Sequence, residues 1–72
     1  MIIYCYAFKS NKFPVTNGPI PGFEEKRTKE NPYYIYADSE KEARRILLKY
    51  IQLNSPSVSE LPSDLEVERS NF

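Results

Sequence analysis

The sequence predicts a small α+β domain with the element order β-β-α-β, and three patterns lead to this prediction. Two segments, residues 1–9 and 33–37, are rich in aromatic and β-branched residues, which favour strands. A capped, amphipathic pattern over residues 40–53 indicates a helix. Residues 65–69 alternate between glutamates and other side chains, as a half-exposed strand does. We therefore expect a three-stranded, mainly antiparallel sheet with one helix packed on one face.

The first predicted strand, residues 1–9, indicates the order of the sheet because both of its faces are apolar. Side chains alternate across a strand, so one face carries Ile2, Tyr4, Tyr6 and Phe8, and the other carries Met1, Ile3, Cys5 and Ala7. A strand without a polar face is typical of the centre of a sheet. We therefore expect the order 2-1-3, with the first strand antiparallel to both neighbours.

Residues 10–32 are predicted to form a long loop. Residues that favour turns recur along this segment: Pro14, Pro19, Pro21, Pro32 and Asn17-Gly18. Within it, part of 23–29 either forms a short helical turn or extends the next strand. A loop of this length in a small domain is usually functional or disordered, so it is one candidate for a working surface.

The helix is predicted from its cap and from its apolar stripe. Ser39 and Glu42 match the Ser-x-x-Glu capping box, so the helix should begin at residue 40 and end near Asn54 and Pro56. Apolar residues recur along it at helical spacing: Ala43, Ile46, Leu47, Tyr50 and Ile51. After a loop over 54–63, the third strand carries charges suited to a sheet edge. Residues 70–72 are expected to fray.

One helix can cover only one face of the predicted sheet, so the other face needs an assignment. The small and aliphatic side chains suit the helix-covered face: Ile3, Cys5, Ala7, Ile35 and Ala37. The opposite face would then hold five aromatic rings: Tyr4, Tyr6, Phe8, Tyr34 and Tyr36. An exposed apolar patch of this size usually marks an interaction site.

Three interpretations of this five-ring face stay open at the level of sequence. The long loop could cover it with its own apolar residues, which are Phe13, Val15, Ile20 and Phe23. The rings could instead bind a protein, because tyrosine is enriched at protein interfaces. They could also stack nucleic-acid bases, although no aromatic-glycine motif of the RNA-recognition type is present.

Composition excludes several classes of function and of site. The 72 residues form at most one domain, 1–72, and carry no histidine, which removes the commonest general base. One cysteine, Cys5, cannot form an internal disulfide, and without histidine it cannot complete a standard zinc site. We expect no enzyme activity and no cofactor. The apolar run 1–8 is too short to span a membrane, so we expect a cytoplasmic protein without membrane contact.

The charges balance overall but are unevenly distributed along the chain. The net charge is zero, which argues against bulk binding to nucleic acid. Residues 9–31 carry a net charge of +2 and residues 54–72 a net charge of −3. Lys26, Arg27 and Lys29 lie in the basic segment, so we expect them at the rim of an interface, where charges set register.

The sequence therefore predicts a small non-enzymatic protein-binding module. It would act as an adaptor, as an inhibitor or as a subunit of a larger assembly, and a phage or mobile-element inhibitor of a host protein fits this description. The partner would be another protein or a second copy of the chain. The predicted binding residues are Tyr4, Tyr6, Phe8, Tyr34, Tyr36, Lys26, Arg27 and Lys29. Binding of single-stranded nucleic acid by tyrosine stacking is the alternative.

Overall fold

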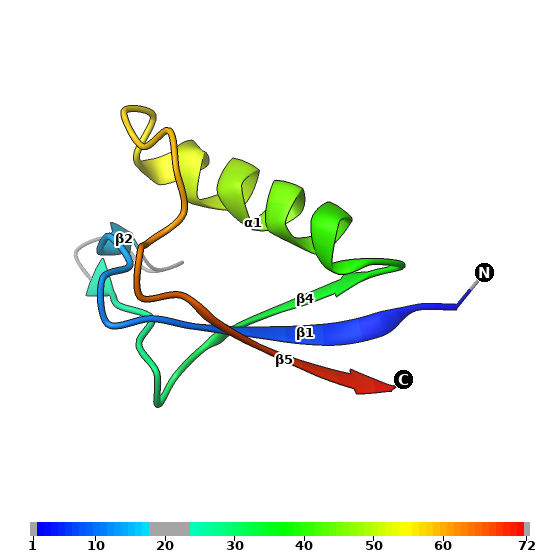
Figure 1. Ribbon diagram of the computed structural model, residues 1–72. Helices are drawn as coiled ribbons and strands as arrows, with labels where there is room; N and C mark the ends of the chain where they lie inside the picture. The colour runs from blue at the N-terminus through cyan, green and yellow to red at the C-terminus, as the bar shows by residue number, and fades with distance from the viewer. Residues whose placement is uncertain (1, 18–23, 72) are drawn as a thin grey trace.

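The computed structural model describes residues 2–17 and 24–71. Its main sheet is formed by β1 (Tyr4–Lys9), β4 (Tyr33–Ala37) and β5 (Glu66–Asn71), and the helix α1 (Glu40–Asn54) packs on one face of it. A second sheet of two short strands, β2 (Thr16–Asn17) and β3 (Glu24–Glu25), lies beyond the end of β1. Figure 1 shows the two layers of the domain, the main sheet and the helix α1 that runs along it.

The main sheet has the order β4-β1-β5, and β1 is antiparallel to both neighbours. In this register Tyr6 lies opposite Ile35 of β4 and opposite Arg69 of β5. The predicted fold class and the predicted order 2-1-3 are therefore confirmed. The strand that is apolar on both faces lies in the middle, where both of its edges are paired.

The elements differ from the prediction in two places. The segment predicted as a continuous loop contains β2 and β3, whose residues Thr16 and Glu25 lie opposite each other, so residues 24–25 do not extend β4. Ser70 and Asn71 were expected to fray, but they pair with Cys5 and Tyr4. Pairing with the central strand gives them backbone hydrogen bonds that a frayed end lacks.

The helix begins and ends close to the predicted positions. The Ser39 hydroxyl accepts a hydrogen bond from the Glu42 N–H at 3.3 Å, and the Ala43 N–H donates to the Ser39 carbonyl at 3.0 Å. These two contacts satisfy backbone groups that a helix start leaves unpaired. At the other end, the Ser55 N–H donates to the carbonyl of Ile51.

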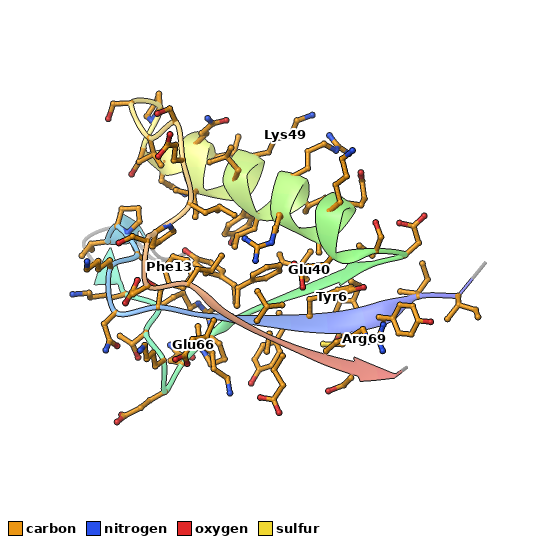
Figure 2. The ribbon with its side chains drawn as sticks, in the orientation of Figure 1. Tyr6, Phe13, Glu40, Lys49, Glu66 and Arg69 are labelled. Carbon is orange, nitrogen blue, oxygen red and sulfur yellow. The ribbon has the colours of Figure 1, made fainter. Side chains whose placement is uncertain are left out.

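The core lies between α1 and one face of the main sheet. Its buried apolar residues come from β1, the following loop, β4 and α1, and are Tyr6, Phe8, Phe13, Tyr33, Ala37, Ala43, Leu47 and Ile51. The helix contributes every fourth residue, which places one stripe against the sheet. Figure 2 shows Tyr6 and Phe13 pointing into the space between sheet and helix.

The predicted assignment of the two sheet faces is wrong for β1, whereas for β4 it is right, because Ile35 and Ala37 pack on the helix side and Tyr34 and Tyr36 are exposed. Residues opposite each other in antiparallel strands share a face, and Phe8 lies opposite Tyr33 while Cys5 lies opposite Tyr36. The even-numbered aromatics of β1 therefore face the helix, and the small residues Cys5 and Ala7 face away. The physical reason is area, because large rings fill the space beneath a helix and gain more from burial than small side chains do.

A polar clasp joins the end of β1 to the segment before β5. The buried Ser10 hydroxyl donates to Asp64 and accepts a hydrogen bond from the Lys12 N–H at 2.9 Å. The other oxygen of Asp64 accepts from the Asn11 N–H at 3.0 Å. The hydrogen bond from Ser10, followed by that from Asn11, lowers the pKa of the Asp64 carboxyl below its ordinary value. The clasp thus holds two loops together at one end of the core.

Candidate functional site: the open face and the outer edge of strand β4

The face of the main sheet that points away from α1 is called the open face. The register assigns to it one set of alternating residues from each strand: Cys5, Ala7, Lys9, Tyr34, Tyr36, Glu66, Glu68 and Ser70. Figure 2 shows Glu66 on the side of the sheet opposite to the helix. The open face therefore combines two aromatic rings on β4, small side chains on β1 and charges along β5.

Tyr34 and Tyr36, here called the tyrosine strip, are the prominent apolar groups of the open face. These residues are 58 % and 54 % exposed, respectively. Because they stand two residues apart on one strand, both rings project from the same face. The neighbouring residues Cys5 and Ala7 on β1 are half-buried and short, so the two tyrosine rings project farther from the sheet than these side chains do.

The hydroxyl of Tyr36 stays protonated at neutral pH. Cys5 lies opposite Tyr36 in the sheet, and the thiol, as a neighbouring ionisable and hydrogen-bonding group, raises the pKa of Tyr36 above its ordinary value. A neutral phenol keeps one hydrogen-bond donor and an apolar ring. Tyr36 therefore offers apolar area with a polar tip and no charge.

The β5 side of the open face carries ion pairs. Lys9 lies 2.7 Å from Glu68, and Lys29 lies 3.6 Å from Glu66. The hydrogen bond from Lys9 lowers the pKa of the Glu68 carboxyl, and the same contact raises the pKa of Lys9. Each lysine of this region is thus matched by a carboxylate, and the face is mixed in charge rather than basic.

The structure divides the eight predicted binding residues among different places. Tyr6 and Phe8 lie in the core, and Tyr4 is half-buried on the helix side, where the Arg69 guanidinium stands 4.7 Å from its ring centre. The predicted five-ring face therefore does not form. Only the tyrosine strip remains exposed on the open face.

The three predicted rim cations do not form one cluster. Lys26 is exposed, and Lys29 reaches β5 through Glu66. Arg27 turns toward the helix-covered side, where its guanidinium lies 5.5 Å from the centre of the Tyr33 ring. It also donates to the Asn31 side chain at 3.1 Å. The basic segment thus divides between the two faces of the sheet.

Among the loop residues expected to cover the aromatic rings, Phe13 joins Tyr6 and Phe8 in the core, whereas the tyrosine strip stays exposed. Phe13 is buried, but it packs edge-on against Tyr33 at 4.8 Å, on the helix side of the sheet. Val15 is 47 % exposed. Ile20 and Phe23, the other two residues of that interpretation, lie outside the described residues.

Two hollows lie along the outer edge of β4, between that strand and α1. The larger, of about 690 Å³, is lined by Ile3, Tyr36, Ala37, Asp38, Ser39, Lys41, Glu42, Arg45 and Ile46. The smaller, of about 240 Å³, is lined by Arg27, Tyr33, Tyr34, Ile35 and Tyr50. Together we call them the β4–α1 groove. Sequence reasoning missed this groove, although the helix carried a signal for it. The predicted apolar stripe includes Ile46 and Tyr50, which lie beside the buried row of Ala43, Leu47 and Ile51.

A third hollow, of about 480 Å³, lies beside the start of α1 and is lined by Tyr4, Tyr6, Asp38, Ser39, Glu40 and Arg69. Within residues 2–17 and 24–71, no group of three or more histidine, cysteine or acidic side chains is placed to hold a metal ion. In the same part of the chain, no helix has the length and apolar character needed to cross a bilayer. No protein-family model, curated protein sequence or solved structure matches the chain.

Proposed function

We propose that this chain is a small non-enzymatic protein-binding module and that its contact surface is centred on β4. The observation that supports this proposal is the tyrosine strip. Two uncharged rings, each more than half exposed, stand side by side on a strand at the edge of the sheet. Tyrosine is enriched at protein interfaces because a rigid ring contributes large contact area with little loss of entropy.

The surroundings of the tyrosine strip favour a protein over a nucleic acid as partner. A nucleic-acid site needs cations that neutralise phosphates along the strand. On the open face, Lys9 and Lys29 are each paired with a glutamate, and the carboxylates Glu66 and Glu68 stand on the same face. Mixed charge of this kind suits the polar rim of a protein interface.

In this proposal the protein acts by occupying the surface of another protein, as an adaptor, an inhibitor or a subunit. No catalytic step is assigned to it, because the chain has no histidine and the Asp64 carboxylate is engaged in the clasp with Ser10. A cytoplasmic location is part of the proposal, since a single half-buried thiol suits a reducing compartment.

The test is an affinity capture from a lysate of the source cells, with and without nuclease, read by quantitative mass spectrometry. We expect a stoichiometric protein partner that survives nuclease treatment. Tyr34→Ala and Tyr36→Ala should each reduce its affinity by roughly 10- to 100-fold, because interface hot spots have effects of this size. Val15→Ala, which shortens an exposed apolar side chain outside β4, is the matched control and should leave capture unchanged.

Two results would contradict the proposal. Unchanged capture by both tyrosine variants, with circular dichroism showing both to be folded, would remove the tyrosine strip from the interface. Capture that disappears on nuclease treatment would support the nucleic-acid alternative, and binding of single-stranded nucleic acid to the chain should then fall steeply with salt.

A further inference from the structure

Three segments of the chain meet at the clasp between Ser10 and Asp64. They are residues 10–12 after β1, residues 26–32 before β4, and residues 55–65 between α1 and β5, here called the strap. Figure 1 shows all three at the end of the domain that lies opposite to the two chain termini. Contacts among these segments close this end of the core.

The strap is attached to both layers of the domain. Three of its apolar side chains pack against the core cluster: Val58, Leu61 and Leu65. On the helix side, the Gln52 side-chain amide donates a hydrogen bond to the Val58 carbonyl at 2.8 Å. On the sheet side, Asp64 accepts hydrogen bonds from the Ser10 hydroxyl and from the Asn11 N–H. The carboxylate of Asp64 is therefore the polar anchor of the strap on the sheet.

A tight turn over residues 28–31 precedes β4 and is closed by its own backbone. The Thr28 N–H donates to the Asn31 carbonyl at 3.1 Å, and the Asn31 N–H donates to the Thr28 carbonyl at 3.2 Å. The Arg27 guanidinium donates to the Asn31 side chain and lies 5.5 Å from the centre of the Tyr33 ring. Because Tyr33 is the first residue of β4, the 28–31 turn is fixed to the start of that strand.

Asn11 contacts the strap with its backbone and the 28–31 turn with its side chain. Its N–H donates to Asp64 at 3.0 Å, and its side-chain oxygen accepts from the Lys29 N–H at 3.3 Å. A second link joins the side chains of Lys29 and Glu66 at 3.6 Å, and exposed ion pairs of this kind contribute little. Ser10, which precedes Asn11, is fully buried and holds the backbone in place. Asn11 is therefore the stronger of these two connections.

We propose that Asn11 is a latch that couples the strap to the 28–31 turn, so that the two segments open together. This inference is independent of the proposed protein-binding function. When the strap lifts, Asp64 withdraws the acceptor of the Asn11 N–H, and the Asn11 side chain loses the orientation in which it holds Lys29. Segments that open together form one cooperative unit. Because coupling is reciprocal, a contact that orders one of these segments also orders the other.

Hydrogen exchange of backbone amides, measured by NMR on the full chain, tests this coupling. Asp64→Ala removes both acceptor oxygens of the clasp. We expect the exchange rates of the Thr28 and Asn31 amides to rise at least 10-fold, as does that of the Val58 amide in the strap, because hydrogen bonds to a charged group have effects of this size. Glu60→Ala removes an exposed carboxylate from the strap and is the matched control, which should leave these rates unchanged.

Asn11→Ala separates coupling from a general loss of stability. This variant keeps the N–H that donates to Asp64 and removes the side-chain oxygen that reaches the 28–31 turn. In the Asn11→Ala background, adding Asp64→Ala should still accelerate exchange at Val58 at least 10-fold. The amides of the turn should then change by less than about 3-fold. The Glu42 amide, at the start of α1 and away from the latch, should change little in every variant.

Three outcomes would overturn the inference. The first is exchange in the 28–31 turn that does not change when Asp64→Ala accelerates the strap. The second is equal acceleration of the turn with and without the Asn11 side chain, and the third is an equal rise at Glu42. If circular dichroism shows that Asp64→Ala does not fold, Asp64→Asn takes its place, because the amide keeps one acceptor oxygen. The strap and the turn should then still respond together, with smaller changes in rate.

Discussion

Tyr33 and Tyr34 are neighbours in the chain and identical in chemistry, yet they lie in opposite environments. Tyr33 is 6 % exposed and packs against Phe13 and Tyr50 beneath the helix. Tyr34 is 58 % exposed on the open face. The comparison teaches that residue type does not decide whether a ring serves the core or the surface. The position of the helix relative to the strand alternation decides it.

The same contrast extends over the whole sheet. The helix-covered face is filled by rings, and Tyr6 and Phe8 stack there with centres 6.4 Å apart. The open face has small side chains at its centre and ion pairs along β5. One face therefore forms the core with the helix, and the other leaves Tyr34 and Tyr36 exposed.

The largest expected effect on stability comes from shortening a ring on the helix-covered face. The same change to a ring on the open face serves as the comparison. Phe8→Ala removes a fully buried side chain and should lower the free energy of unfolding by about 3–5 kcal/mol. That loss is comparable to the whole stability of a domain of this size. Tyr34→Ala should change it by less than about 0.5 kcal/mol. Urea denaturation of both variants measures the difference, and equal losses would contradict the assignment of the two faces.

A smaller effect is expected at the clasp that closes one end of the helix-covered face. Ser10→Ala removes a buried hydroxyl that donates to Asp64 and accepts from the Lys12 N–H. We expect the free energy of unfolding to fall by about 1–3 kcal/mol, as for other buried hydrogen bonds to a charged group. Thermal unfolding followed by circular dichroism measures this. Ser63→Ala, at an exposed position of the same region, is the control and should have little effect.

The smallest effect is expected on the open face, where acid should weaken the pair of Lys9 and Glu68. Lys9 lowers the pKa of Glu68 in the folded state. The stability from this pair is therefore fully present above about pH 4.3, the ordinary glutamate value, and is lost as pH falls through the lowered pKa.

Glu68→Gln tests this pH dependence. The variant should show a shallower decline in the free energy of unfolding between about pH 5 and pH 2 than the unchanged protein. Glu60→Gln, at an exposed loop position, should keep the original decline. Parallel curves for the Glu68→Gln variant and the unchanged protein would show that this ion pair adds no pH dependence.

Local patterns were sufficient to predict the elements of the fold and their order. The capping box at Ser39 and Glu42 marks the start of α1, and the two apolar faces of β1 place it at the centre of the sheet. These features depend on neighbours in sequence or on a single strand. The β2–β3 pair was missed because two-residue strands have too little pattern to detect.

The candidate site was predicted only in part, because it depends on how two strands align. Tyr34 and Tyr36 are on the exposed face, whereas Tyr6 and Phe8 are in the core. Which set of β1 residues shares a face with which set of β4 residues is a matter of register, and a shift of one residue exchanges the faces. The wall formed by Ile46 and Tyr50 depends on where the helix lies over the sheet, which periodicity alone does not specify.

The central position of β1 also shapes how the chain reaches its fold. β1 is the first strand along the chain, but its two neighbours follow the long loop and the helix, respectively. Pairing distant segments closes large loops before contacts are gained, so such topologies fold slowly. During synthesis on the ribosome, the apolar residues of β1 are made before β4 and β5, the two strands with which they pair. The three-stranded sheet is completed only when residues 66–71 have emerged, because β5 supplies the second neighbour of β1.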